Sequence, residues 1–321
     1  MKKYNNILVP GGAGFIGANV IKEIIDDSNR ITVIDNLSTG SRFNIEQFSH
    51  LPNYRFIFGD ITCKEDIRHL CDEKYDLILN FACPANPPYC FSHPLEIMKT
   101  NVYGVFNLVE IAQKSNAVFF QSSTSEVYGD PEVSPQNEEY WGHVNPIGVR
   151  ACYDEGKRCV ESILYDYNRV HGLDIRICRI FNTYGPGMNI EDGRVIVQFI
   201  INALNNKPLI INGDGTQTRS FCYIEDLIVG INRILELDNM PDMPINLGSD
   251  KEITIIDLAK IIICLTDSKS QIIFQNRTPD DPRRRQANCN YANTLINWKP
   301  TICIEDGLKH TIDYFFNMTK V

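Results

Sequence analysis

The first half of the chain alternates short, continuously apolar runs with longer segments of helical periodicity. Apolar runs that predict β-strands lie at residues 6–9, 30–34, 55–58, 77–81 and 118–121. Apolar residues recur every three or four positions at 16–26 and 95–114, which predicts helices. Strands alternating with helices are typical of βαβ units, and strands that are apolar throughout fit burial on both faces. We therefore expect a parallel sheet covered by helices on both sides.

The second half of the chain is less regular. A helix is predicted at residues 153–170 and a strand at 174–179. Proline and glycine then punctuate loops and short elements, at Pro186, Gly187, Gly193, Pro208, Gly213 and Gly215. This pattern suits a smaller lobe beside the main sheet. The predicted fold class is α/β, a Rossmann-like, doubly wound parallel sheet with a smaller C-terminal lobe.

Composition narrows the function classes. The chain has 321 residues and a net charge of -9, and such an acidic protein is a poor candidate for general nucleic-acid binding. The 11 cysteines show no C-x-x-C spacing, which argues for reduced thiols rather than a zinc site or a disulfide framework. The histidines show no ligand spacing either, so we expect no metal. No apolar stretch approaches the roughly 20 residues of a spanning helix, and we expect a cytoplasmic protein that does not bind membranes.

A glycine-rich loop is the strongest local feature. Gly11, Gly14 and Gly17 follow a predicted strand and open a predicted helix. Such glycines let the backbone approach a pyrophosphate, and the helix N-terminus supplies free N–H groups. Asp35 ends the next strand, where a carboxylate binds a ribose diol and repels a 2′-phosphate. Asn36 follows it rather than an arginine. The loop therefore predicts a dinucleotide site, and NAD rather than NADP.

Two further contacts to this cofactor are expected. Asp60 and Ile61 follow the third strand and could reach the adenine, although a surface turn with Asp60 as a helix N-cap is an alternative. With the glycine loop in place, we expect an NAD-binding Rossmann domain at residues 1–180, with later segments around 220–247 returning to it. Residues 181–321 then form mainly a substrate-binding lobe.

Tyr153 and Lys157 form a Y-x-x-x-K pair on a predicted helix, and this spacing puts both side chains on one helical face. A phenol titrates near 10 in water. A neighbouring ammonium and an oxidised nicotinamide would both lower that pKa. The resulting phenolate could remove a proton from a sugar hydroxyl. An ordinary surface pair is the alternative, but a cluster of hydroxyl residues at 122–125 ends a strand, where ligands bind in such sheets.

The glycine loop, this hydroxyl cluster and the Y-x-x-x-K pair together resemble the extended short-chain dehydrogenase/reductase family, which acts on nucleotide sugars. Within it, several segments are similar to the UDP-glucuronate decarboxylases (UDP-xylose synthases). These segments are residues 123–133, 140–147, 150–158, 179–186, 192–195, 217–219 and 280–285. The resemblance covers nearly the whole chain, and the segment Arg-Ala-Cys-Tyr-Asp-Glu-Gly-Lys-Arg at 150–158 is more specific than the glycine motif.

This resemblance implies a reaction and a set of catalytic residues. The sugar would be oxidised at C4, lose its C5 carboxylate as CO2 and take the hydride back, giving UDP-xylose. Thr124 would act beside Tyr153 and Lys157, and Glu126 and Arg285 would lie near the sugar carboxylate. Within the run 283–285, the resemblance implies Arg285, because alignment on Asp281-Pro282 places the family's catalytic arginine at that position.

The resemblance also implies binding residues. Pro84, Asn182, Arg194 and Arg219 would join Glu126 and Arg285 in binding the substrate, and arginine suits bidentate phosphate binding. Phe15 and Ile16 would complete the cofactor contacts made by the glycine loop, Tyr153 and Lys157. Family members pair two long helices into a dimer, so a homodimer is expected.

Several alternatives stay open. The same fold supports a 4,6-dehydratase, for which Ser125-Glu126 lacks the usual acidic pair, and a 4-epimerase, against which Glu126 argues. A decarboxylase could act on another uronate such as UDP-N-acetylglucosaminuronate, or release the 4-keto pentose. A cofactor-binding regulatory protein without activity would usually lack the tyrosine or lysine. Two departures from the decarboxylase pattern are Pro10 before the glycines and the stretch 89–93, which we expect over the sugar.

Overall fold

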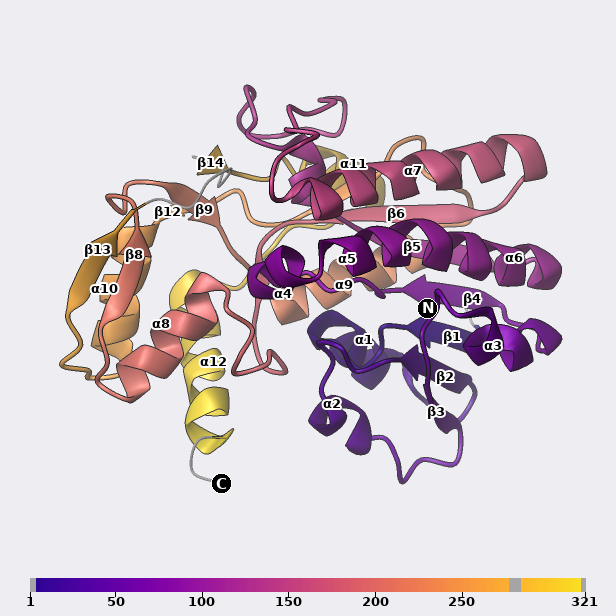
Figure 1. Ribbon diagram of the computed structural model, residues 1–321, viewed down its shortest axis with the longest axis horizontal. Helices are drawn as coiled ribbons and strands as arrows, with labels where there is room; N and C mark the ends of the chain where they lie inside the picture. Colours follow the sequence, from indigo (N-terminus) through magenta and orange to yellow (C-terminus); the bar gives the residue numbers. More distant parts are fainter. Residues whose placement is uncertain (1–3, 277–283, 319–321) are drawn as a thin grey trace.

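A seven-stranded sheet forms the centre of the molecule (Figure 1). The computed structural model describes residues 4–276 and 284–318. The strand order is β11-β6-β5-β4-β1-β2-β3, and every neighbouring pair is parallel. The strands are β1 (Asn6–Pro10), β2 (Arg30–Asp35), β3 (Tyr54–Phe58), β4 (Leu77–Asn80), β5 (Val118–Thr124), β6 (Ile175–Ile180) and β11 (Ile245–Leu247).

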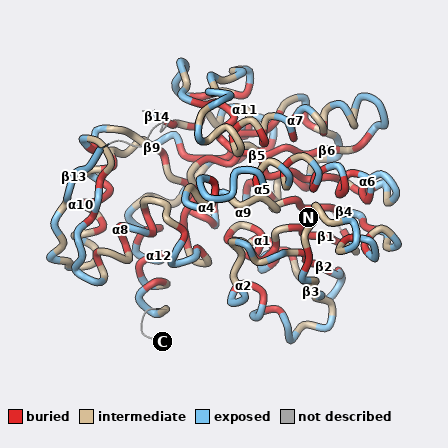
Figure 2. The backbone as a smooth tube through the Cα atoms, in the orientation of Figure 1, coloured by how far each residue is buried: buried red, intermediate tan, exposed pale blue. Residues whose placement is uncertain are grey.

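Alternate residues of each strand pack on opposite faces of this sheet, as the side-chain period of a strand requires. In β1, Ile7 and Val9 belong to one apolar core, and Leu8 belongs to the other. The core that contains Leu8 is closed by α3 (Lys64–Ile67), α6 (Val105–Ser115) and α7 (Ala151–His171). The core that contains Ile7 and Val9 is closed by α1 (Phe15–Ile24) and α9 (Ile224–Leu235). The sheet is thus covered on both faces, and buried residues follow its strands (Figure 2).

The remaining elements of the first half lie at the ends of strands. They are α2 (Arg42–Glu46), α4 (Pro87–Ser92), α5 (Pro94–Lys99) and the short 3₁₀ helices η1 (Arg68–Asp72) and η3 (Ser125–Tyr128). A π-helical turn, η2 (Thr100–Gly104), joins α5 to α6, so the helix predicted at 95–114 is interrupted. Such turns insert an extra residue into the helix, which periodicity over 20 residues does not reveal.

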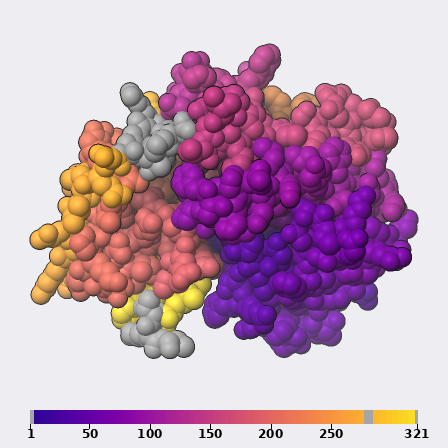
Figure 3. Space-filling view, viewed as in Figure 1, coloured from indigo at the N-terminus to yellow at the C-terminus, as the bar shows by residue number. Residues whose placement is uncertain are grey.

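The second half builds a smaller lobe beside this sheet (Figure 1). Its strands form three small sheets: β8 (Leu209–Asn212) with β13 (Ile272–Gln275), β7 (Thr183–Tyr184) with β10 (Cys222–Tyr223), and β9 (Thr218–Ser220) between β12 (Glu252–Thr254) and β14 (Arg284–Arg285). Its helices are α8 (Val195–Leu204), α10 (Ile255–Leu265) and α12 (Ile304–Met318), whereas α11 (Asn290–Ile296) packs against β11 and α9 beside the central sheet. The two parts meet along a seam in the space-filling view (Figure 3).

The predicted fold class is confirmed, since the structure is a doubly wound parallel sheet with a smaller lobe. Each strand expected in the first half is present within two or three residues of its predicted ends. The chain also returns to the sheet after leaving it, because β11 pairs with β6 from Ile245 to Leu247. Pro10 leaves β1 intact: its carbonyl accepts a hydrogen bond from Phe81, and Gly11 donates to Ile34.

Candidate active site

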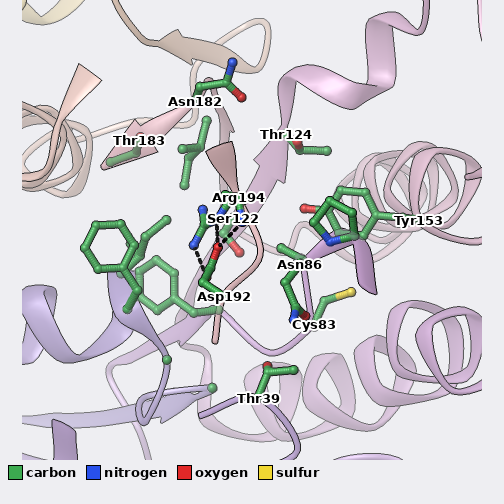
Figure 4. A pocket seen from close by; sticks show the side chains of 18 of the residues that line it. Thr39, Cys83, Asn86, Ser122, Thr124, Tyr153, Asn182, Thr183, Asp192 and Arg194 are labelled. Carbon is green, nitrogen blue, oxygen red and sulfur yellow. Dashed lines mark hydrogen bonds and ion pairs between the residues drawn. The ribbon is translucent and has the colours of Figure 1, made fainter. Parts of the chain in front are cut away.

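Two adjoining cavities lie at the carboxyl ends of the central strands, where ligands bind in open α/β sheets. The larger has a volume of about 410 Å³ and extends from the glycine loop to the smaller lobe. The smaller has a volume of about 90 Å³ and lies beside the end of β2. Gly11, Gly14 and Cys83 line both cavities, which places the two in one cleft. Figure 4 shows the cleft with Tyr153 and Thr124 on one side and Arg194 and Asp192 on another.

The glycine loop forms the floor of this cleft. Gly11 has a φ of +77°, and a Cβ atom there would lie 2.5 Å from the backbone of Phe81 and Ala82. A Cβ on Gly17 would lie 2.6 Å from the Gly11 carbonyl oxygen. Only glycine therefore allows the turn from β1 into α1. Gly14 is the N-cap of α1 and has no side chain with which to cap it, so the N–H groups of the first turn face the cleft at Phe15 and Ile16.

The smaller cavity presents the residues expected at the adenosine end of a dinucleotide. Asp35, Asn36, Asp60 and Ile61 all line it. The Asp35 carboxylate accepts hydrogen bonds from the backbone of Ala13 (3.0 Å) and Leu37 (2.8 Å), which fix its orientation. Burial raises the pKa of Asp35 above its ordinary value. The Asn36 amide donates to Asp60 at 3.0 Å. A carboxylate held at the end of the second strand, beside a glycine cradle, fits NAD and disfavours a 2′-phosphate.

Tyr153 and Lys157 lie on the same face of α7 and line the larger cavity, as predicted from their spacing. The Lys157 ammonium lies 5.8 Å from the centre of the Tyr153 ring and donates to the Ser122 carbonyl at 2.9 Å. Thr124, at the end of β5, lines the same wall and hydrogen-bonds Tyr153. Its hydroxyl also accepts from the Glu126 backbone at 3.2 Å, which begins η3.

The protein's own groups do not make Tyr153 acidic, contrary to part of the expectation from sequence. Burial raises the pKa of Tyr153 well above its ordinary value, and the nearby thiols of Cys83 and Cys90 raise it further. The hydrogen bond with Thr124 acts in the opposite direction. Burial also lowers the pKa of Lys157, because an ammonium loses hydration there. Lys157 alone therefore does not lower the pKa of Tyr153, and the positive charge of an oxidised nicotinamide has to contribute.

Glu126 lines the larger cavity and lies between two arginines. Its carboxylate is 3.0 Å from the guanidinium of Arg285 and 2.9 Å from that of Arg150. Burial raises the pKa of Glu126, but nearby guanidinium groups outweigh burial and lower it to about 2. In decreasing order of effect, these groups belong to Arg285, Arg150 and Arg219. Glu126 is therefore a carboxylate held between cations, and a poor proton donor.

Of the two arginines of the run that the structure describes, Arg284 and Arg285, it is Arg285 that reaches the cleft. It is 1% exposed and donates to Ser125 at 3.1 Å and to the Gly129 carbonyl at 2.9 Å. Arg284 points the other way, because successive residues of β14 face opposite sides, and it pairs with Glu252 while 54% exposed. Arg283, with the Asp280-Asp281-Pro282 segment used to align the run, lies outside the described residues.

The other predicted substrate residues divide between the two cavities. Asn182, Arg194 and Arg219 line the larger one. Arg194 pairs with Asp192 and lies 5.8 Å from the centre of the Phe15 ring, beside the glycine loop (Figure 4). Pro84 differs from the expectation: it lines the smaller cavity with Asp35 and Asp60, because the chain leaving β4 runs over the cofactor end of the cleft.

The stretch 89–93, expected over the sugar, forms the end of α4 near the cofactor side. Tyr89 lines the larger cavity, and its hydroxyl donates to Glu96 at 2.8 Å. Its ring stacks on His93 at 4.3 Å. Burial raises the pKa of Tyr89, and Ser38 and Asp60, both at the cofactor end, act on it as well. Tyr89 thus lines the larger cavity close to groups of the cofactor end, and a position of this stretch over the sugar stays a prediction.

Arg150 is the functional candidate that sequence reasoning missed. It lines the larger cavity one residue before α7 and pairs with Glu126, 24 positions away in sequence. The available signal was its place three residues before Tyr153 in the specific segment 150–158. Asp154, which follows Tyr153, is buried and belongs to the same group of charges.

Neither a metal centre nor a membrane span is found in residues 4–276 and 284–318. These residues hold no group of three or more His, Cys, Asp or Glu side chains that could bind a metal ion. Their helices are also too short or too polar to cross a bilayer. The polar groups that line the cleft include hydroxyl, ammonium, guanidinium and carboxylate groups.

Comparison with known proteins supports this interpretation of the cleft. UDP-glucuronic acid decarboxylase 6 of Arabidopsis thaliana is 45% identical over 303 residues, which are 94% of this chain and 86% of that protein. UDP-glucuronic acid decarboxylase 1 of Danio rerio is 42% identical, over 98% of this chain and 73% of that protein. Among solved structures, UDP-glucuronic acid 4-epimerase from Bacillus cereus, in complex with UDP-glucuronic acid and NAD, is 27% identical with a TM-score of 0.87, covering 98% of this chain and 99% of that one.

A family model assigns the chain more directly. The model of the NAD dependent epimerase/dehydratase family matches residues 7–248, which include the whole central sheet and most of the cleft. This match agrees with the extended short-chain dehydrogenase/reductase resemblance and with NAD as the cofactor. The chain therefore belongs to the NAD dependent epimerase/dehydratase family.

Proposed function

We propose that this protein is a UDP-glucuronate decarboxylase that forms UDP-xylose and CO2. The observation that carries the proposal is that Arg150 and Arg285 line the same cavity as Thr124, Tyr153 and Lys157. Two guanidinium groups provide a receptor for a sugar carboxylate, and arginine is suited to bidentate carboxylate binding. Relatives of 42–45% identity that bear the name UDP-glucuronic acid decarboxylase support the same substrate.

The reaction begins at the sugar 4-hydroxyl. NAD held by the glycine loop would take up a hydride from the sugar and supply it again, and the positive charge of its oxidised ring would favour the phenolate form of Tyr153. Tyr153 is the general base that removes the hydroxyl proton, and Thr124 orients that hydroxyl. Lys157 supports the phenolate from 5.8 Å, measured to the ring centre. These three side chains convert the alcohol at C4 into a ketone.

Oxidation at C4 activates the carboxylate for loss, because C6 is then β to a ketone. The C5–C6 bond breaks, CO2 leaves, and the electron pair moves through C5 and C4 onto O4. Tyr153 and Thr124 stabilise that enolate oxygen by hydrogen bonds. C5 then takes one proton and the ketone is reduced again. The chain's own contribution is to hold the carboxylate at Arg150 and Arg285 while it supports charge at O4.

The charge state of Glu126 helps to separate this reaction from a 4,6-dehydration. A dehydratase must protonate the 6-hydroxyl as it leaves, so it needs an acid near C6. Glu126 is the nearest carboxyl group to that position in our proposal, and its pKa of about 2 keeps it ionised at neutral pH. Ser125, its neighbour, binds Arg285 and is too weak an acid for this step. The arrangement therefore favours decarboxylation.

A 4-epimerase is the second candidate, because solved relatives of similar fold include a UDP-glucuronic acid 4-epimerase. Product mass distinguishes the two reactions, since an epimer keeps the mass of the substrate and a decarboxylated sugar loses CO2. UDP-N-acetylglucosaminuronate tests a different uronate, and accumulation of reduced nicotinamide tests release of a 4-keto pentose. We assign Asn182, Arg194 and Arg219 to the nucleotide and its diphosphate because they line the cavity between Phe15 and Glu126.

We propose further that residues 1–180, with later segments around 220–247, form the NAD-binding domain, and that 181–321 form mainly the substrate lobe. The return of β11 to the central sheet supports this division.

A homodimer, formed through α5, α6 and α7, is the expected assembly. Large apolar side chains are exposed along these helices, namely Leu95 on α5 (75%), Tyr103 on the η2 turn between α5 and α6 (60%) and Val170 on α7 (72%). Light scattering at micromolar concentration tests it, and a monomer would contradict it. A cytoplasmic location remains our proposal for the compartment.

A further inference from the structure

An asparagine on α1 ties the start of that helix to the chain that enters the smaller lobe. The Asn19 amide donates hydrogen bonds to the carbonyl of Phe15 (2.9 Å) and to that of Pro186 (3.1 Å). Gly187 follows with a φ of +95°, and a Cβ atom there would lie 2.9 Å from Nδ2 of Asn19. A glycine is therefore needed for the turn to approach α1 this closely. The mechanism above does not use this contact.

A second asparagine, on α2, makes the corresponding link to the glycine loop itself. Asn44 is 4% exposed, and its amide donates to the carbonyls of Ala13 (3.1 Å) and Gly187 (3.2 Å). Ala13 is part of the glycine loop, and its own N–H donates to Asp35 at 3.0 Å. An asparagine amide has two N–H donors, which is enough for one bond to the glycine loop and one to the turn.

The turn held by these amides leads directly to an arginine that we assign to the substrate. Beyond Gly187, the chain supplies Asp192 and Arg194, which line the larger cavity and form an ion pair with each other. The Arg194 guanidinium lies 5.8 Å from the centre of the Phe15 ring, at the start of α1. The turn at 186–187 thus joins the loop that fits the dinucleotide to the segment assigned to the diphosphate of the substrate.

The two bridges link the position of this turn to that of the glycine loop. Separation of the two segments would break amide–carbonyl hydrogen bonds and leave a donor of the buried Asn44 side chain unmet, which is unfavourable. A ligand that fixes the glycine loop therefore also restrains the turn, and the second ligand loses less conformational freedom when it binds. Thermodynamic linkage makes this effect reciprocal.

We propose that Asn19 and Asn44 couple the two binding sites, so that NAD on the glycine loop strengthens binding of the uridine diphosphate part of the substrate. This inference rests on the proposed function, because it requires a nucleotide diphosphate at Arg194. Both asparagines are positioning residues, since they act through the turn at 186–187. The coupling concerns the nucleotide alone, so it holds whether the sugar is decarboxylated or epimerised.

Isothermal titration calorimetry of the full chain with UDP, at saturating NAD and without NAD, measures the coupling as the ratio of two dissociation constants. UDP carries no sugar, so no turnover occurs during the titration. Asn44 lines the larger cavity, but loss of a direct contact with UDP would lower the affinity by the same factor in both titrations and leave the ratio unchanged. The ratio therefore reports the coupling rather than a contact with one ligand.

Asn19→Ala and Asn44→Ala each remove one bridge. Asn19 lines neither cavity and lies within α1, where alanine is favoured, so Asn19→Ala tests the proposal on its own if Asn44→Ala does not fold. Asn53→Ala is the matched control. The Asn53 amide also joins two backbone carbonyls, those of Asp26 and Asn29, and Asn53 lines neither cavity.

We expect UDP to bind the wild type at least about fivefold more tightly when NAD is bound. The ratio should fall by at least about twofold in Asn19→Ala and in Asn44→Ala, since each loses a hydrogen bond between the segments, and Asn53→Ala should keep it. A ratio of one in the wild type, or the wild-type ratio in Asn19→Ala, would overturn the inference. Absence of UDP binding with NAD in place would instead overturn the nucleotide assignment within the proposed function.

Discussion

The ammonium of Lys157 lies 5.8 Å from the centre of the Tyr153 ring, and its hydrogen bond goes to the Ser122 carbonyl rather than to the phenol. Lys157 is therefore anchored to the end of β5 and acts on Tyr153 through space. Burial raises the pKa of the phenol and lowers that of the ammonium, so the site disfavours the charged form of both groups. A pair arranged in this way becomes an effective base when the oxidised cofactor adds positive charge.

Replacing Tyr153 by phenylalanine should abolish turnover and leave cofactor binding intact. The variant loses the base and a donor to O4 but keeps the ring that packs in the cleft, so we expect kcat to fall by at least about 10³-fold. Steady-state rates with UDP-glucuronate and NAD fluorescence titration measure the two effects. Tyr167→Phe, on the same helix, should keep a normal rate. A Tyr153→Phe variant with a rate near that of the wild type would exclude Tyr153 as the base.

Substitution of Gly11 by alanine should destroy the cofactor site. The new Cβ would lie 2.5 Å from the backbone of Phe81 and Ala82, and the φ of +77° would add strain of about 1–3 kcal/mol. Gly172→Ala is the matched control, since its φ is +69° and no atom lies within 4 Å of the added Cβ. The melting temperature should fall in both variants, because both place alanine at a positive φ, while NAD affinity should fall only in Gly11→Ala. Normal NAD binding by Gly11→Ala would contradict the assigned cradle.

Adjacent arginines of β14 allow a paired test of the carboxylate receptor. Arg285→Met should lower kcat/KM for UDP-glucuronate by at least about 100-fold, since it removes a charged hydrogen-bond donor and leaves Glu126 with one cation fewer. Arg284→Met removes an exposed pair with Glu252 and should change kcat/KM less than threefold, because exposed pairs contribute about 0–1 kcal/mol. An equal fall of kcat/KM in both variants would show that the arginines act only through their positive charge and not through a specific contact of Arg285.

Stability should depend on pH through Asp154 in a defined direction. A carboxyl whose pKa is raised from 3.8 to about 7 on folding stabilises the folded state below pH 3.8, and that contribution is lost as pH rises to 7. The pKa of Glu126 is lowered on folding, so Glu126 stabilises the folded state above pH 4.5. Its contribution to the free energy of unfolding is therefore constant between pH 5 and pH 8. The free energy of unfolding of Asp154→Asn, relative to that of the wild type, should therefore rise by on the order of 2 kcal/mol from pH 5 to pH 8.

Chemical unfolding of both proteins at the two pH values measures this difference. Asp166→Asn provides the control for a general effect of removing a carboxylate from α7, and its stability relative to the wild type should not change with pH. If the difference between Asp154→Asn and the wild type is the same at pH 5 and pH 8, the raised pKa of Asp154 is wrong.

Local sequence pattern predicted much of the fold because its signals are short-range. Ile7, Leu8 and Val9 are all apolar, since β1 is buried on both faces, and Gly11 and Gly17 are required by contacts within a few residues of the loop. The π-helical turn at 100–104 and the three-residue strand β11 carry no comparable pattern. Their positions depend on packing against segments distant in sequence.

In the candidate site too, the residues predicted from sequence are those with a short-range signal. Tyr153 and Lys157 were predicted from spacing along one helix, whereas Arg150 and Asp154 in the same segment were not given a role. Their importance depends on η3 and β14, which bring Glu126 and Arg285 against the start of α7 across 24 and 135 positions of sequence. Burial raises the pKa of Tyr153 in the protein alone, and this effect cannot be read from the i, i+4 pair. The lowering expected with an oxidised nicotinamide in place stays a prediction.

Incubation of the purified protein with UDP-glucuronate and NAD, followed by mass spectrometry of the nucleotide sugar and absorbance of reduced nicotinamide, tests the central claim most directly. The account predicts conversion to a UDP-pentose that has lost CO2, with no net accumulation of reduced nicotinamide. A product with the mass of the substrate would indicate an epimerase, and an intact substrate under conditions where NAD is bound would contradict the proposed decarboxylation of UDP-glucuronate.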